Sequence, residues 1–443
     1  MKEPTQLRRR DLLRGAAGFA ALATLAGRGD AQIAASNVIM RKTARNCIFI
    51  NLQGAPSHID TFDVKEGPWN PPDAKIQQTG GGFALSQTLF PEMSKIARDM
   101  TILRSVSSWE AAHDRGQFYL QTSHPSNPAF AAEIPHIGSV IGLERGATGL
   151  LPPFLSLNSS NLQGAKFLGG QFEPLSPGIS PTGINTLEHN FYGPNSQARF
   201  EEKFKLLRAL DAPVQSMFHD DGVSAQSSYF DAAKKMMYTP KIAAVFRYTS
   251  DDAGRYGDTQ VGRGCIIARN AVQSKTGTVF TSVVQGGWDT HQNMFDRSYA
   301  PNIYQLAGDL DRAVGALVAD LKQSGDFNST LIVIMGEFGR TPGDLNARGG
   351  RDHHKDAMSV VMLGGGVQGG RTIGETDNFA AQIVTPGWTG DRPVKMEDIT
   401  ATIYSALGIN WTKSITDTPS GRRFEYVPLG SSGFYVPVEE VFG

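Results

Sequence analysis

The sequence has few cysteines and little net charge. Cys47 and Cys265 are the only cysteines among 443 residues, and neither belongs to a Cys-x-x-Cys pair or a Cys/His cluster, which argues against a structural zinc knot. The two thiols either form one disulfide in an exported protein or stay free and buried. The formal net charge of −1 gives no general attraction to nucleic acid or to an anionic membrane, so neither is an expected partner.

The sequence also lacks an apolar run long enough to cross a membrane. The run from Gly15 to Gly27 has only about 13 residues, whereas a membrane-spanning helix needs about 20. It follows Arg8-Arg-Arg-Asp-Leu-Leu-Arg14, which resembles a twin-arginine export signal, and small residues at 29–31 offer a cleavage site. We expect residues 1–31 to be a signal peptide that engages the twin-arginine translocase, with an uncleaved anchor as the alternative. The mature chain would then be periplasmic or secreted.

Apolar, β-branched runs alternate along the mature chain with stretches of helical spacing. The expected buried strands include residues 46–52, 278–284, 329–335 and 359–363. They are apolar on both faces, as in a sheet covered by helices on both sides. We therefore predict an α/β fold with a mostly parallel central sheet and helices on both faces. Residues 32–443 would form a single domain, with a long surface excursion at about 158–198.

Histidines and carboxylates gather where the predicted strands end. Asp289 and His291 follow the strand at 278–284, in the sequence Gly286-Gly-Trp-Asp-Thr-His291. The alternative without a functional role is that Asp289 caps the next helix and His291 faces solvent. Comparable residues after other strands are His58, Asp60, His113, Glu337 and His353. Carboxyl ends of parallel strands meet at one edge, so such residues can assemble a metal site without a local motif. Imidazole and oxygen ligands suit Zn, Mn, Fe, Mg or Ca, and the sequence does not choose among them.

Several short motifs, taken together, make a resemblance to a known family specific. They are Gly54-Ala-Pro-Ser-His-Ile-Asp-Thr-Phe-Asp63, Phe167-Leu-Gly-Gly170, Gly286-Gly-Trp-Asp-Thr-His291, Glu337-Phe-Gly-Arg-Thr-Pro342, Gly350-Arg-Asp-His353 and Gly364-Gly-Gly366. The chain resembles the exported domain-of-unknown-function 1501 family, a branch of the alkaline phosphatase/sulfatase superfamily. The resemblance implies an alkaline phosphatase-like core with metals at the strand ends. It also implies that Asp60, Asp289, His291, Glu337 and His353 are ligands.

The chain departs from the superfamily pattern at the nucleophile. Superfamily enzymes use Ser, Thr or formylglycine at a helix start after the second strand. Here that region holds Ser105, Ser107 and Ser108, none of them in a recognisable motif. The sulfatase pattern Cys/Ser-x-Pro-x-Arg is absent, so formylglycine chemistry has no support. Glu337 stands where the superfamily has an Asp-His pair, which removes one expected ligand.

Two functions of different classes follow from these residues. The first is an exported, metal-dependent hydrolase of phosphate or sulfate esters, acting on a small-molecule or glycan substrate. The second is a non-catalytic protein that binds an anionic glycan or a partner at the same cleft, because the nucleophile motif is missing while the carboxylates and histidines are kept.

The hydrolase hypothesis assigns a role to each candidate residue. The expected ligands of a divalent metal, Zn or else Mn, Ca or Mg, are His58, Asp60, Asp289, His291 and His353. Arg340 would hold the oxygens of the anion, and His113 or Glu337 would move protons. The attacking group would be a water activated by the metal, or a serine such as Ser105 or Ser108.

Overall fold

The computed structural model describes residues 38–443 except 148, 180–194, 218–229, 232 and 235. The chain divides into two compact units, Met1–Ile39 and Met40–Gly443, and the elements described below belong to the second. The signal peptide expected at 1–31 lies outside the described residues and stays a prediction. Among the helices of the described part, none combines the length and the apolar composition that a membrane crossing requires.

A seven-stranded sheet forms the centre of the second unit. Its strands, in spatial order, are β11 (Arg371–Ile373), β4 (Met100–Val106), β10 (Met358–Leu363), β7 (Thr330–Met335), β1 (Asn46–Leu52), β6 (Phe280–Gln285) and β5 (Phe154–Leu157). Strand β10 runs antiparallel to both of its neighbours, whereas all other adjacent pairs are parallel. The predicted α/β class with a mostly parallel central sheet is therefore confirmed.

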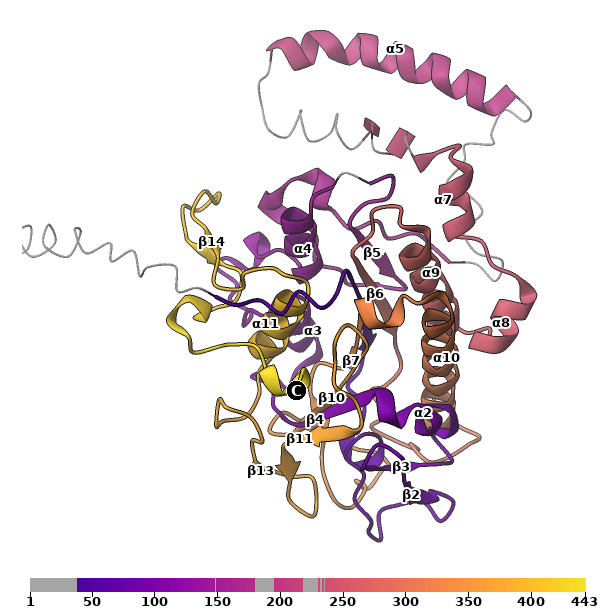
Figure 1. The fold of residues 1–443 in the computed structure, drawn as a ribbon, viewed down its shortest axis with the longest axis vertical. Coiled ribbons are helices and arrows are strands. Elements are labelled where there is room, and N and C mark those ends of the chain that lie inside the picture. The colour runs from indigo at the N-terminus through magenta and orange to yellow at the C-terminus, as the bar shows by residue number, and fades with distance from the viewer. Residues whose placement is uncertain (1–37, 148, 180–194, 218–229, 232, 235) are drawn as a thin grey trace, which may run out of the picture. The chain divides into compact units, whose positions relative to one another are not determined.

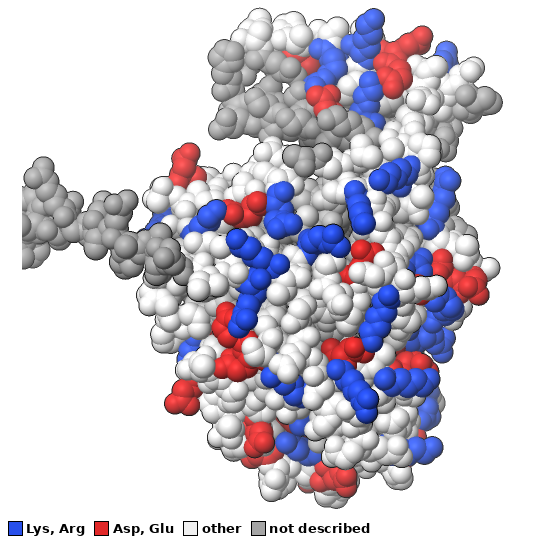
Figure 2. Space-filling view, in the orientation of Figure 1, with Lys and Arg blue, Asp and Glu red and all other residues white. Residues whose placement is uncertain are grey.

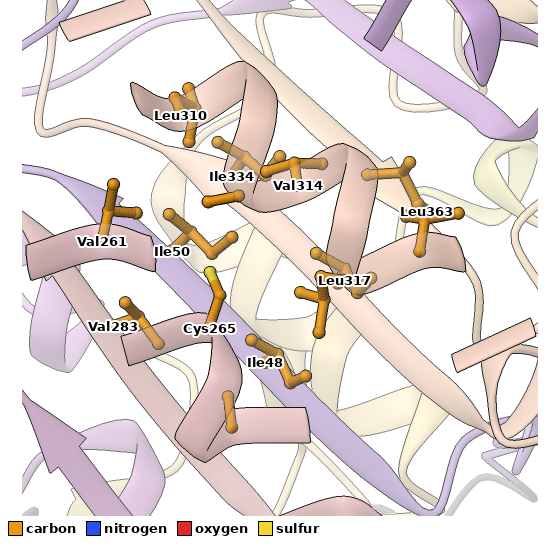
Figure 3. Packing of buried hydrophobic residues seen from close by; sticks show 14 of the residues in the cluster. Ile48, Ile50, Val261, Cys265, Val283, Leu310, Val314, Leu317, Ile334 and Leu363 are labelled. Carbon is orange, nitrogen blue, oxygen red and sulfur yellow. The ribbon is translucent and has the colours of Figure 1, made fainter. Parts of the chain in front are cut away.

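Helices cover both faces of this sheet (Figure 1). One face carries α2 (Pro91–Lys95), α8 (Ser250–Tyr256), α9 (Gln260–Ser274) and α10 (Ile303–Ser324); the other carries α3 (His113–Thr122), α4 (Ile137–Arg145) and α11 (Met396–Ala406). Alternation along β1 explains how one strand serves both layers. Ile48 and Ile50 pack against α9 and α10 in the main apolar core (Figure 3), whereas Asn51 points the other way and bonds to Gln117 of α3.

The remaining elements lie in the connections. They are α5 (Ser196–Met217), α7 (Pro240–Val245), and the short strand pairs β2 (Ile76–Gln78) with β3 (Ala84–Ser86), β8 (Gly339–Arg340) with β9 (His353–His354), β12 (Glu375–Thr376) with β13 (Ile383–Thr385), and β14 (Ser414–Ile415) with β15 (Phe424–Glu425). The described start of the excursion expected at 158–198 holds two single 3₁₀ turns, η4 (Lys166–Leu168) and η5 (Gly170–Phe172). Basic and acidic side chains lie interspersed on the face seen in Figure 2.

The two cysteines are free and buried. Cys265 of α9 belongs to the core on the Ile48 side of the sheet. Cys47 is the neighbour of Ile48 on β1, so its side chain points to the opposite face. The sheet separates the two sulfurs, and of the two alternatives left open by the sequence the structure has free thiols.

The buried carboxylate of Asp320 connects α8, α9 and α10 through hydrogen bonds. Asp320 of α10 accepts hydrogen bonds from Arg255 of α8 at 2.7 and 2.8 Å, from Arg269 of α9 at 2.5 Å and from the Tyr256 hydroxyl at 2.9 Å. Burial by itself raises the pKa of Asp320, but the hydrogen bonds from Arg255, Arg269 and Tyr256 outweigh it and lower the pKa to about 2. The ionised carboxylate therefore stabilises the packing of these helices.

Replacing Asp320 should destabilise the fold in a pH-dependent way. Because the folded-state pKa lies below the usual 3.8, the stabilisation is present above that value and is lost as the pH falls toward 2. We expect Asp320→Asn to cost about 2 kcal/mol at neutral pH, since it takes one of two carboxylate partners from the buried Arg269 guanidinium and leaves only Asp252. In thermal unfolding, the gap between wild type and variant should close below about pH 4. The exposed Asp251→Asn change in α8 is the control, and an equal loss there would contradict this account.

Candidate metal centre

Four loops meet at one edge of the sheet because β1, β4, β6 and β7 run in the same direction. Two glycines let their backbones come close. Gly54, after β1, has φ +105°, and a Cβ there would lie 2.4 Å from the Asp289 nitrogen. At Gly350 a Cβ would lie 2.2 Å from the His291 carbonyl carbon. The segment that follows β6 is therefore held between the loop after β1 and the loop that precedes β9.

The side chains at this edge form one compact group. His113, Asp289, His291 and His353 each offer a ligand atom, and these four atoms lie within 4.8 Å of one another. One oxygen is the common point: Asp289 Oδ1 lies 3.1 Å from His113 Nε2, 3.0 Å from His291 Nε2 and 3.6 Å from His353 Nε2. The group is partly open to solvent, because the Asp289 side chain is 46% exposed. We call these four residues the candidate metal centre.

Each histidine of the centre is oriented through its other ring nitrogen. Nδ1 of His113 lies 2.7 Å from Glu337 Oε1, and Nδ1 of His291 lies 2.6 Å from Asp352 Oδ1. Nδ1 of His353 lies 2.7 Å from the Ala111 carbonyl oxygen, which can only accept a hydrogen bond. Acceptors at all three Nδ1 atoms place the proton there and leave the Nε2 lone pairs facing the centre, as is usual for metal-binding histidines.

The Nε2 atoms fit a cation better than they fit one another. Nε2 of His291 and Nε2 of His353 are 3.0 Å apart, a contact that two lone pairs cannot make without a proton or a metal ion between them. His113 Nε2 is buried and has no hydrogen bond of acceptable geometry to any residue that the structure describes. In a tetrahedron with bonds of about 2.0–2.1 Å, the ligand atoms lie about 3.3–3.4 Å apart. The three distances from Asp289 Oδ1 and the distance between Nε2 of His291 and Nε2 of His353, 3.0–3.6 Å, are close to this value. Three imidazoles and a carboxylate are a donor set that suits zinc.

Arg340 is the buried cation that contacts the candidate metal centre. Its guanidinium bonds to Asp289 Oδ1 and to the carbonyl oxygens of Gly54, Ala55 (3.0 Å) and Arg351 (3.1 Å). Its Nη1 also lies 3.3 Å from Nε2 of His291. Burial raises the pKa of Asp289, but the hydrogen bond from Arg340 outweighs it, so the pKa is lowered and Asp289 stays ionised. The predicted role of Arg340, to hold the oxygens of a bound anion, stays a prediction, because its donors are directed at protein acceptors.

The electrostatic surroundings of the histidines differ. The hydrogen bond to Glu337 raises the pKa of His113, helped by the charge of Asp289. Burial lowers the pKa of His353, with Arg340 adding to the effect. Glu337 is fully buried and accepts a hydrogen bond from the Gly54 nitrogen at 3.0 Å. Glu337 thus lies behind His113 rather than among the four converging residues.

The structure places His58 and Asp60 in other contacts. Asp60 is buried and accepts hydrogen bonds from Arg351 at 2.6 and 3.2 Å and from Ser57 at 2.5 Å. His58 Nε2 lies 2.7 Å from the Ala380 carbonyl oxygen, and burial lowers the pKa of this histidine to about 4. Neither belongs to the converging group, so their assignment as ligands has no geometric support here and stays a prediction.

The two serines predicted as nucleophiles are buried and bonded locally. Ser105 Oγ donates to the Pro386 carbonyl oxygen at 2.6 Å, and Ser108 Oγ accepts from the Glu110 nitrogen at 3.1 Å. Neither is part of the candidate metal centre. His113, assigned from the sequence to proton transfer, does belong to it. Its position at the first turn of the helix that follows β4 is the signal that could have marked it as a ligand.

Residues 44–432 match the family model described as a protein of unknown function, DUF1501. The chain belongs to this family. No curated protein matches the chain.

Several solved structures resemble the chain distantly. A complex of Ps i-CgsB with k-i-k-neocarrahexaose has 13% identity and a TM-score of 0.41 over 82% of this chain and 72% of that one. The PsFucS1 sulfatase from Pseudoalteromonas sp. has 11% identity and a TM-score of 0.39 over 92% and 73%. A protein in the alkaline phosphatase superfamily from Vibrio parahaemolyticus has 10% identity and a TM-score of 0.37 over 83% and 67%. Similarity at this level carries no inference about what the DUF1501 chain does.

Removing the carboxylate behind His291 should weaken metal binding. Asp352→Asn takes away the charge that holds Nδ1–H of His291, and loss of such an outer partner costs about 10–100-fold in metal affinity. Asp356→Asn is the matched control, because Asp356 is exposed, lies four residues away and contacts only Lys355 among the described side chains. Zinc affinity measured by chelator competition should fall in the first variant alone. Equal affinities in both variants would contradict the assignment of His291 as a ligand.

Proposed function

We propose that this DUF1501 protein is a metal-dependent hydrolase of phosphate or sulfate esters. A divalent ion, zinc or else Mn, Ca or Mg, would be held by His113, Asp289, His291 and His353. The observation that carries the proposal is the convergence of three Nε2 atoms on Asp289 Oδ1 while each Nδ1 faces an acceptor. The position of the group at the carboxyl ends of parallel strands supports it, because ligands of open α/β sheets bind there.

The chemistry of the site divides between the ion and the chain. A bound divalent ion would act as a Lewis acid on an ester oxygen and would lower the pKa of a water. The centre is partly open to solvent at Asp289, whose side chain is 46% exposed. Glu337 and Asp352 fix the tautomers of His113 and His291 by accepting hydrogen bonds from their Nδ1–H groups. Because Ser105 and Ser108 are buried elsewhere, the attacking group in this proposal is water rather than a serine.

The choice of substrate rests on the sequence. Resemblance to the alkaline phosphatase/sulfatase superfamily supports an ester of phosphate or sulfate, on a small molecule or a glycan. Export by the twin-arginine translocase to the periplasm or beyond belongs to the same proposal, and Arg8 to Arg14 with the apolar run behind them support it.

A non-catalytic role at the same edge is the second candidate. The raised pKa of His113 favours it, because an imidazolium between Glu337 and Asp289 would balance the two carboxylates without a metal. The buried Ser105 and Ser108 agree with it, since both hydroxyls form local hydrogen bonds away from the centre. Such a protein would bind an anionic glycan or a partner without turning it over.

Two adjacent histidines provide the test of the proposed function. His353→Ala removes a member of the centre, whereas His354→Ala removes a ring whose Nε2 bonds to the Ala381 carbonyl oxygen. We expect protein exported by its native host to carry stoichiometric metal and to hydrolyse an aryl phosphate or an aryl sulfate. His353→Ala should lose the metal and at least about 100-fold in kcat/KM, and His354→Ala should keep both.

The outcomes separate the two candidates. Wild-type protein that is free of metal and turns over neither ester, yet retains an anionic oligosaccharide, would support the non-catalytic role. Equal losses in the two histidine variants would show that the effect comes from the fold of the β8–β9 hairpin rather than from the centre.

A further inference from the structure

A cavity lies beyond the opposite end of α3 from the candidate metal centre. The helix begins at His113 and ends at Thr122, so His124 stands about 15 Å from the centre along the helix axis. The cavity has a volume of about 320 Å³, within the range of small-molecule sites. Nothing in the proposed hydrolysis uses it.

Four aromatic rings form part of the cavity wall. His124 stacks on Phe424 with ring centroids 5.2 Å apart, and Phe167 meets Phe424 edge-on at 5.6 Å. Phe130 forms a further wall. Burial lowers the pKa of His124, so its ring is uncharged at neutral pH and acts as a flat wall. Phe167 opens the Phe167-Leu-Gly-Gly170 motif, which the proposed function leaves unexplained. Walls of this kind suit a planar aromatic group.

Two opposite charges line the same cavity without pairing. The Arg422 guanidinium lies over the Phe130 ring, 4.7 Å from its centroid, and in the described part of the chain no acceptor bonds to it. Glu133 accepts a hydrogen bond from Ser420 Oγ at 2.6 Å, and no cation of the described residues lies within ion-pair distance of its carboxylate. The other charged side chains of the lining are engaged locally, since Arg423 Nε donates to Ser414 Oγ at 2.9 Å.

We propose that this cavity binds a small aromatic zwitterion such as an aromatic amino acid. The ring would lie between the Phe130 and Phe167 walls, the carboxylate of the ligand would bind Arg422, and its ammonium group would bind Glu133. A ligand that carries both charges satisfies the guanidinium and the carboxylate together, whereas a simple anion would be repelled by Glu133 and a simple cation by Arg422.

Three related probes test the proposal by isothermal titration calorimetry on the full chain. L-Phenylalanine carries both charges, phenylacetate only the carboxylate and phenethylamine only the ammonium group. We expect L-phenylalanine to bind wild type with a Kd of about 0.1–1 mM, typical of a ligand of this size, and at least about tenfold more tightly than either other probe.

Three exposed or half-exposed positions give matched variants. Arg422→Gln should weaken L-phenylalanine about tenfold and leave phenethylamine binding unchanged or tighter, because only the carboxylate contact is lost. Glu133→Gln should weaken L-phenylalanine and leave phenylacetate unchanged or tighter. Arg423→Gln changes the neighbouring arginine, whose Nε is bonded to Ser414 Oγ, and should change none of the three affinities.

The outcomes that overturn the proposal are distinct. Absence of saturable binding of all three probes to wild type would show that the cavity takes no such ligand. Tighter binding of phenylacetate than of L-phenylalanine would make it a simple anion site, and tighter binding of phenethylamine would make it a cation site. Equal losses of L-phenylalanine affinity in Arg422→Gln and Arg423→Gln would remove the specific role of Arg422.

Discussion

The direction of four strands is the constraint on which the candidate metal centre depends. Because β1, β4, β6 and β7 are parallel, loops far apart in the sequence open at one edge, and a single oxygen, Asp289 Oδ1, can meet histidines from three of them. The sheet is rigid because its strands are buried on both faces, as alternation along β1 shows. A site built on such strand ends is positioned by the core and needs no local sequence motif.

The fold could be predicted because burial leaves a periodic signal in the sequence. Apolar runs such as 46–52 and 329–335 became β1 and β7, as their burial on both faces requires. The same runs also predict where each strand ends, and therefore which residues lie at the edge of the sheet. Asp289, His291 and His353 were predicted as ligands, and the structure brings all three together.

Contacts between distant residues are what the sequence could not show. Asp60 follows β1 in a position like that of a ligand, yet its carboxylate is taken by Arg351, 291 residues further along the chain. The β8–β9 hairpin sets Arg340 opposite His353 although each strand has only two residues, too few for any periodicity. The sequence assigned His113 to proton transfer rather than to the metal. Its convergence with the other histidines depends on where α3 begins, which the sequence did not show.

The charge of the centre implies that a metal ion and a protonated state would compete there. Without metal, the contact between Nε2 of His291 and His353 needs one proton, and an imidazolium at His113 between its two carboxylates needs another. Two protons and one divalent ion bring the same charge. Burial and the nearby Arg340 guanidinium lower the pKa of His353, however, and so oppose the proton at that ring. A metal ion at the centre would meet all three Nε2 atoms at once, and its binding would release the protons that they otherwise hold.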